Sequence, residues 1–152
     1  MEQFNLLQNN TILEIFFFIF GTIIGSFLNV CISRIPDEKS IVFPPSHCPK
    51  CKAKIKPEHN IPVFSYIFLK GKCAGCKSKI SIQYPIVELI SGLLTFLLFI
   101  KFGLSLEFLT YMVLCMSLIV ITFIDLKYMI IPNIISLPGI IVGLLFSCLL
   151  YT

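Results

Sequence analysis

Long apolar runs alternate with a single polar insert along this chain. Four of the runs approach the ~20 residues that a helix needs to cross a bilayer, and they cover residues 12–32, 84–100, 104–124 and 134–151. A polar segment separates the first run from the second, whereas the other connections are short. The pattern predicts an all-α polytopic membrane protein with about four transmembrane helices and a small insert between helices one and two.

Composition and charge support a membrane protein and predict its orientation. Hydrophobic residues make up 57% of the chain and charged residues only 13%, which is too apolar for an ordinary soluble domain. Ten of the twelve Lys and Arg residues lie within residues 34–79. Because short basic loops stay cytoplasmic, we expect the insert and the connection 125–133 inside and the N-terminus outside. We expect no nucleic-acid binding, since basic and aromatic residues are not interleaved in the insert.

The insert carries two cysteine pairs, Cys48-Pro-Lys-Cys51 and Cys73-Ala-Gly-Cys76. Each C-x-x-C turn can supply two thiolates to a tetrahedral zinc ion, and the spacing of the pairs is close to that of a zinc ribbon. The pattern therefore favours a zinc site formed by Cys48, Cys51, Cys73 and Cys76, with His47 as a neighbour rather than a ligand. A thiol–disulfide redox pair is the main alternative, and two structural disulfides are a weaker one.

Small and polar residues interrupt two of the apolar runs. Gly21 and Gly25 form a small-xxx-small pattern in the first run, and Gly139 and Gly143 repeat it in the last. Such a pattern allows another helix to approach closely. Asn29 follows in the first run, and an amide in hydrocarbon must face protein or water. We expect Asn29 to form an interhelical hydrogen bond rather than to act directly in catalysis.

Asp125 is the strongest candidate for a catalytic role among the acidic residues. It stands at the end of the third apolar run, where an acid is commonly a solvated helix flank. The alternative is half of an aspartic dyad, in which two carboxylates share one proton while one activates water and the other protonates the leaving group. Glu88 is the other acid near the membrane on this side, and it could pair with Asp125 or neutralise a lysine.

Short motifs follow one another in a fixed order across nearly the whole chain. They are Gly25-Ser-Phe-Leu-Asn-Val30 with Arg34-Ile-Pro36, His47-Cys-Pro-Lys-Cys51, Asn60-Ile-Pro62, Gly71-Lys-Cys73, Cys76, Ile80-Ser81, Tyr84-Pro85 with Glu88, Asp125, and Ile131-Pro-Asn133. Each motif alone is weak. Together and in this order, they resemble the type IV prepilin leader peptidase family, membrane aspartic proteases that are often also N-methyltransferases.

The resemblance implies a function, a location and roles for particular residues. Asp125 would be the first catalytic aspartate, and the four cysteines would hold a cytoplasmic zinc ion. The protein would lie in the inner (plasma) membrane of a bacterial cell and cleave the leader of type IV prepilin or pseudopilin precursors at the cytoplasmic face. It would then methylate the new N-terminus, with S-adenosylmethionine as the methyl donor.

One departure from the family pattern limits this expectation. The second catalytic aspartate of the family belongs to a Gly-x-Gly-Asp motif, which does not occur here. We therefore expect residues 1–33 to form the first transmembrane helix, 34–83 the zinc insert, and 84–152 the N-terminal part of a truncated protease domain. We expect a fragment of a longer protease, a prematurely terminated product or half of a split protein, so that a downstream segment or a second chain would supply the missing aspartate and this chain alone would be inactive. The alternatives are a non-catalytic membrane zinc module that binds substrate or a partner, and a membrane thiol–disulfide oxidoreductase.

Overall fold

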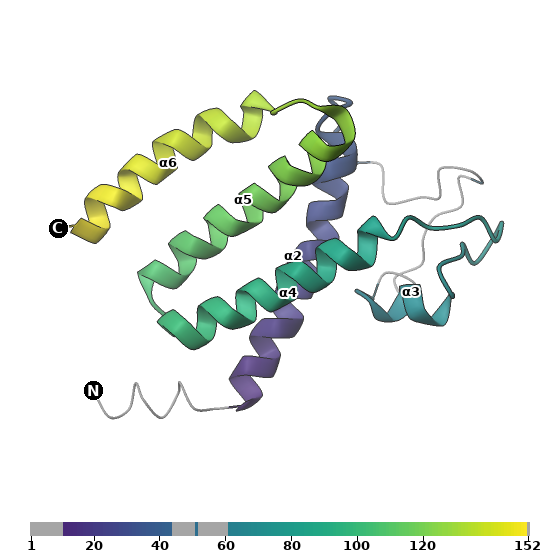
Figure 1. The fold of residues 1–152 in the computed structure, drawn as a ribbon, viewed down its shortest axis with the longest axis horizontal. Coiled ribbons are helices and arrows are strands. Elements are labelled where there is room, and N and C mark those ends of the chain that lie inside the picture. Colours follow the sequence, from purple (N-terminus) through teal and green to yellow (C-terminus); the bar gives the residue numbers. More distant parts are fainter. Residues whose placement is uncertain (1–10, 44–50, 52–60, 152) are drawn as a thin grey trace.

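The computed structural model describes residues 11–43, 51 and 61–151, and these residues are mostly helical. In chain order, the elements drawn in Figure 1 are α2 (Thr11–Arg34), α3 (Phe64–Phe68), α4 (Gln83–Phe102), α5 (Leu106–Tyr128) and α6 (Asn133–Tyr151). The four long helices coincide with the four predicted runs to within a few residues. The predicted all-α fold, with a polar insert between its first two long helices, is confirmed.

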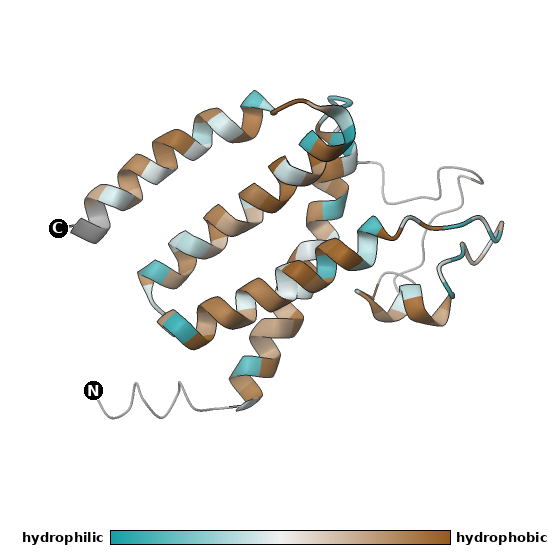
Figure 2. Ribbon diagram, viewed as in Figure 1, coloured by the Kyte–Doolittle hydropathy of each residue, from teal (hydrophilic) through white to brown (hydrophobic). Residues whose placement is uncertain are grey.

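Three helices, α2, α4 and α5, are long and apolar enough to cross a membrane. Figure 2 shows that apolar residues predominate along these helices, while several hydrophilic residues lie at helix ends and in the described part of the insert. The fourth predicted span is also an apolar helix. Its stretch Asn133–Cys148 is shorter than the other three.

The α4–α5 connection is a tight hairpin, as the short polar gap predicted. Gly103 follows α4 with φ 58°, and its N–H donates to the Phe99 carbonyl. This left-handed residue satisfies one of the carbonyls that every helix end leaves open. Two residues later, the Ser105 hydroxyl accepts a hydrogen bond from the Phe108 N–H at 3.1 Å and caps α5.

The boundary between α5 and the next connection differs from the prediction. Hydropathy placed the end of the third span at residue 124, but the helix continues to Tyr128. Met129 then takes φ 54° and donates its N–H to the Asp125 carbonyl at 2.8 Å. Asp125 therefore lies in the last turn of α5 rather than in the loop. Hydropathy marks where apolar side chains stop, whereas the backbone hydrogen bonds continue through the polar residues.

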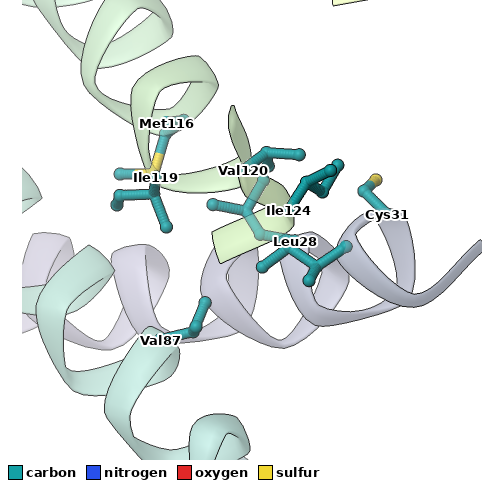
Figure 3. Close-up of a cluster of buried hydrophobic side chains, with 8 residues drawn as sticks. Leu28, Cys31, Val87, Met116, Ile119, Val120 and Ile124 are labelled. Carbon is teal, nitrogen blue, oxygen red and sulfur yellow. The ribbon is translucent and has the colours of Figure 1, made fainter. Parts of the chain in front are cut away.

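The core lies where α2, α4 and α5 meet. Figure 3 shows its main cluster of buried side chains, which come from all three helices: Leu28, Cys31, Ile32, Val87, Met116, Ile119, Val120 and Ile124. A second cluster, near the other end of α2, contains three phenylalanines. The Phe17 ring stacks on Phe99 at 4.3 Å and meets Phe108 edge-on at 5.4 Å, both between centroids. Two separate clusters thus fix α2 against α4 and α5.

Glycines bring α2 and α4 into close contact, as the first small-xxx-small pattern predicted. A Cβ atom on Gly21 would lie 2.5 Å from the Thr95 hydroxyl, and one on Gly25 would lie 2.7 Å from the Glu88 Cα. Gly92 of α4 is equally crowded against α2. A Cβ atom on Gly139 or Gly143 of α6 would have no atom of the described residues within 4 Å, apart from the backbone of its own helix. The second pattern therefore makes no close helix contact in this part of the chain.

Candidate functional site

A small hairpin positions the second cysteine pair. Lys72 and Lys79 form an antiparallel bridge, and the Cys73 N–H donates to the Ser78 carbonyl at 2.8 Å. Lys77 takes φ 55°, and its N–H donates to the Cys73 carbonyl at 3.0 Å. The backbone therefore closes on itself around Cys73 and Cys76, so both side chains start from a fixed turn.

Three cysteine sulfurs converge at this hairpin. The Sγ atoms of Cys51, Cys73 and Cys76 all lie within 4.8 Å of one another, and those of Cys51 and Cys73 are 4.0 Å apart. In a tetrahedral zinc site with Zn–S bonds of about 2.3 Å, sulfurs are about 3.8 Å apart. The geometry and the soft thiol ligands both suit zinc. The predicted fourth ligand Cys48 and its neighbour His47 lie outside the described residues.

The same sulfurs do not form a disulfide in this structure. A disulfide bond is about 2.0 Å long, half the 4.0 Å between the Cys51 and Cys73 sulfurs. The Cys76 sulfur lies 3.1 Å from the Ser78 hydroxyl oxygen, a hydrogen-bonding distance. The three sulfurs converge without a disulfide bond between them, an arrangement that could hold a metal ion.

Asp125 lies on the exposed side of the last turn of α5. The residue before it, Ile124, is completely buried in the core cluster and faces α2. Since successive residues of a helix point about 100° apart, the side chain of Asp125 leaves the bundle. The structure thus presents this carboxylate on the outside of the three-helix core.

The Asp125 end of α5 lies beside the turn that follows α2. Tyr128, Ile35 and Ile41 all pack against the same core cluster. The pKa of the Asp37 carboxyl in this turn lies below its usual range, mainly because Lys39 donates a hydrogen bond to it at 2.7 Å. The positive charge of Lys127 adds to this effect. The C-terminal ends of α2 and α5, which carry these charges, therefore lie at the same end of the bundle.

Glu88 is buried, and its contacts match neither predicted pairing. Its Oε2 accepts a hydrogen bond from the Val63 N–H at 2.7 Å, and the Ser26 hydroxyl donates to the same carboxylate. It therefore joins α4 to α2 and to the residue just before α3. The sequence prediction considered side-chain partners only, whereas the structure uses a backbone N–H more than twenty residues away.

Asn29 forms the interhelical contact that the sequence predicted. It is 2% exposed, and its Nδ2 donates to the Tyr84 carbonyl of α4 at 3.1 Å and to the Gly25 carbonyl at 3.3 Å. A side-chain amide in an apolar bundle is stable when its donors are satisfied in this way. The role of Asn29 in helix packing is confirmed.

Sequence reasoning missed the hydroxyl groups along the α2–α4 contact. Thr22, Ser91 and Thr95 are all buried, and each hydroxyl donates to a carbonyl of its own helix. This bonding satisfies the hydroxyls without requiring a partner across the interface. The signal was present in the sequence, because Ser91, Gly92 and Thr95 recur at one-face helical spacing.

Comparison with known families places most of this region in one domain. The model of the bacterial peptidase A24 N-terminal domain matches residues 19–102, more than half of the chain. The match covers α4, most of α2 and the cysteine-bearing insert between them. No solved structure matches the chain significantly.

Curated relatives match over a longer stretch. A prepilin leader peptidase/N-methyltransferase of Myxococcus xanthus is 42% identical over 86% of this chain and 39% of its own length. Proteins of the same name in Neisseria gonorrhoeae and Bacillus subtilis are 39% and 42% identical over 85% and 76% of this chain. The chain spans about half the length of these relatives, from 39% to 54%. With its three apolar helices of membrane-spanning length, this multi-pass membrane protein belongs to the family of the bacterial peptidase A24 N-terminal domain.

Proposed function

We propose that this chain forms the N-terminal part of a prepilin leader peptidase that acts in a bacterial plasma membrane. The proposal rests on the alignments with proteins named prepilin leader peptidase/N-methyltransferase. These alignments cover 76–86% of the chain at 39–42% identity. The names favour neither a thiol–disulfide oxidoreductase nor a non-catalytic zinc module. The substrate is a type IV prepilin or pseudopilin precursor.

Asp125 is the catalytic residue that we assign in this chain. One carboxylate of a dyad activates water while its partner protonates the departing amine. Asp125 lies one turn from the end of an apolar helix, so it reaches the membrane surface at a fixed depth. A substrate anchored by its own apolar helix places its scissile bond at a comparable depth, and this lowers the entropic cost of alignment.

The second carboxylate of the dyad comes from outside residues 1–152. Glu88, the other acid that the sequence suggested, is engaged with Val63 and Ser26. The Gly-x-Gly-Asp motif of the family does not occur in these residues. We propose that a polypeptide carrying that motif, as a downstream segment or a second chain, completes the dyad.

The insert, which we place in the cytoplasm, holds a structural zinc ion through Cys48, Cys51, Cys73 and Cys76. Four thiolates fill the coordination shell and leave no open position for a substrate. The bound ion supplies a cross-link between the two C-x-x-C turns in a segment too small for a core of its own. Methylation of the new N-terminus with S-adenosylmethionine is the second activity that we propose, without assigning its residues.

Cleavage by a completed enzyme tests the role of Asp125. The chain alone should leave the precursor intact, and fusion or co-expression with a segment bearing Gly-x-Gly-Asp should restore leader removal. The nearly isosteric Asp125→Asn cannot act as a base and should reduce that activity by at least about a thousandfold, because cooperating catalytic groups act as a unit. The measurement is the gel shift of a precursor in membranes.

Glu107→Gln is the matched control for Asp125→Asn. Glu107 is also an exposed acid of α5, but it lies in the first turn, at the opposite end of the helix. Glu107→Gln should therefore keep full activity. Substantial cleavage by the Asp125→Asn enzyme would mean that Asp125 is only a helix flank, and the catalytic assignment would be wrong.

Metal analysis tests the zinc site. Purified protein should contain about one zinc ion per chain, and Cys48→Ser, Cys51→Ser, Cys73→Ser and Cys76→Ser should each lose most of it. Cys115→Ser in α5 is the control and should retain it. If Cys48→Ser keeps its zinc while the other three lose it, the fourth ligand is another residue. Retention by all four variants rejects the site.

Cysteine labelling in intact cells tests the orientation. Lys39 and Leu104 are both exposed and lie just beyond opposite ends of the bundle. An impermeant maleimide should add label to Leu104→Cys and none to Lys39→Cys beyond the background of the native cysteines. The reverse result would place the insert outside the cell and reject the proposed cytoplasmic cleavage.

A further inference from the structure

One segment of the insert carries several exposed apolar side chains among the described residues. Ile61, Phe64, Ile67 and Phe68 are 52%, 63%, 65% and 82% exposed, and α3 contains no buried residue. We call residues 61–68 the apolar segment. It lies in a lysine-rich connection. Clustered exposed apolar side chains of this size mark an interaction surface rather than a water-facing loop.

The apolar segment lies beside the membrane helices and not beyond their ends. A groove of about 710 Å³ has residues 61–64 on one side and α2 residues between Phe18 and Val30 on the other. Glu88, which binds the Val63 N–H, meets α2 at Gly25. Gly25 lies nine residues before Arg34, the end of α2, and this corresponds to roughly 13 Å along the helix axis. Figure 1 shows α3 to the side of the bundle, near the start of α4.

Protein acceptors satisfy four successive or nearby N–H groups of the apolar segment, those of Val63, Phe64, Ser65 and Ile67. Hydrocarbon offers no water, so every N–H group that enters it needs a protein acceptor. Pro62 has no N–H, and the Phe64, Ser65 and Ile67 N–H groups donate to carbonyls of the same segment. Val63 is the N-cap residue of α3 and has a φ of 60°. Its N–H donates to the buried Glu88 carboxylate. A water-exposed turn would not need this carboxylate.

Positive charge follows the apolar segment directly. Residues 61–82 contain Lys70, Lys72, Lys77 and Lys79 and no acidic residue, and all four lysines are exposed. Apolar side chains next to exposed basic ones are typical of polypeptide at a bilayer surface, where lysines attract anionic headgroups. The charge therefore selects anionic lipid as the occupant of this surface over a basic or neutral protein.

We infer that the apolar segment enters the lipid leaflet beside α2 and α4, with the four lysines on the phosphates of anionic phospholipids. Glu88 acts as the anchor, because it ties the start of α3 to α4 inside the bundle. The Cys73–Cys76 hairpin follows within a few residues, so lipid binding also fixes the metal-binding hairpin at the membrane surface. This inference does not depend on the proposed peptidase activity.

Tryptophan fluorescence tests the inference directly, since the chain has no tryptophan. Phe64→Trp and Phe68→Trp are introduced singly and reconstituted into vesicles of equal parts phosphatidylcholine and phosphatidylglycerol. The vesicles are prepared with or without bromine on the acyl chains. Phe16→Trp, on the exposed apolar side of α2, is the lipid-facing control. Lys39→Trp, 66% exposed after α2, is the water-facing control.

Brominated lipid should quench Phe64→Trp and Phe68→Trp nearly as strongly as Phe16→Trp, while aqueous acrylamide quenches them several-fold less than Lys39→Trp. Quenching by acrylamide at the level of Lys39→Trp would overturn the inference. So would protection from both quenchers, because that result would mean that protein covers the segment.

Two further variants test the anchor and the charges. Glu88→Gln retains an acceptor for the Val63 N–H and should preserve bromolipid quenching in the Phe64→Trp background, whereas Glu88→Ala should at least halve it. Lys70, Lys72, Lys77 and Lys79 are replaced together by Gln in the Phe68→Trp background. This change should abolish the extra quenching seen with phosphatidylglycerol over pure phosphatidylcholine. Equal quenching in the two lipid mixtures before the change would reject the role of anionic headgroups.

Discussion

Two helices of this protein carry the same small-xxx-small pattern but use it differently. In α2, Gly21 and Gly25 lie so close to α4 that a Cβ atom would come within 2.5–2.7 Å of it. In α6, a Cβ atom on Gly139 or Gly143 would have no atom of the described residues within 4 Å, apart from the backbone of its own helix. The pattern makes a close approach sterically possible, but it does not provide the helix that approaches.

The complementary surface of α4 explains the difference. Ser91 and Thr95 offer small side chains opposite the α2 glycines, and their hydroxyls are satisfied within α4. Without water to drive apolar association, helices in a membrane gain from close packing and hydrogen bonds. A glycine pair therefore contributes only where the facing helix has matching small residues.

Gly25→Ala should give the largest change at the α2–α4 contact. Its new methyl group would lie 2.7 Å from the Glu88 Cα, a backbone atom that cannot move without shifting α4. Overpacking of this kind lowers stability by about 1–3 kcal/mol, more than the gain in helix propensity. The measurement is unfolding in detergent by denaturant titration. Unchanged stability would mean that the two helices are less close in the membrane than in this structure.

Asn29→Ala should have the next largest effect on the same contact. It removes the hydrogen bond to the Tyr84 carbonyl and leaves that part-buried acceptor with one partner fewer. We expect a loss of about 1 kcal/mol, as for other interhelical hydrogen bonds in membranes. Ser117→Ala is the control, because the exposed Ser117 hydroxyl donates to Val113 of its own helix. Equal effects of the two changes would remove Asn29 from the contact.

Gly143→Ala should give the smallest change and the opposite sign. With open space around Gly143, the methyl group meets no atom of the described residues, and alanine is favoured over glycine inside a helix by about 0.5–1 kcal/mol. The same detergent unfolding should therefore show a slight gain in stability. A loss would show that another helix or another copy packs on α6, and the contrast with α2 would disappear.

The functional residues show the same division between pattern and packing. The spacing of the cysteine pairs predicted that they converge, and three of the four sulfurs do so in the described residues. Asp125 was recognised from its place in the chain, but its position in the last turn of α5 came from the Met129 cap. The contact between Glu88 and Val63 had no sequence signal, since any backbone N–H can bind a carboxylate.

Local features of the chain were enough to predict the four long helices, the polar insert, and the residue types for a zinc site. These features are the length of apolar runs, the spacing of thiols and the placement of charge. Packing between helices was needed to establish which glycines have a partner, where Glu88 directs its carboxylate, and where residues 61–68 lie beside α2. Those contacts join distant segments, and apolar periodicity leaves them open because every face of a membrane helix is apolar.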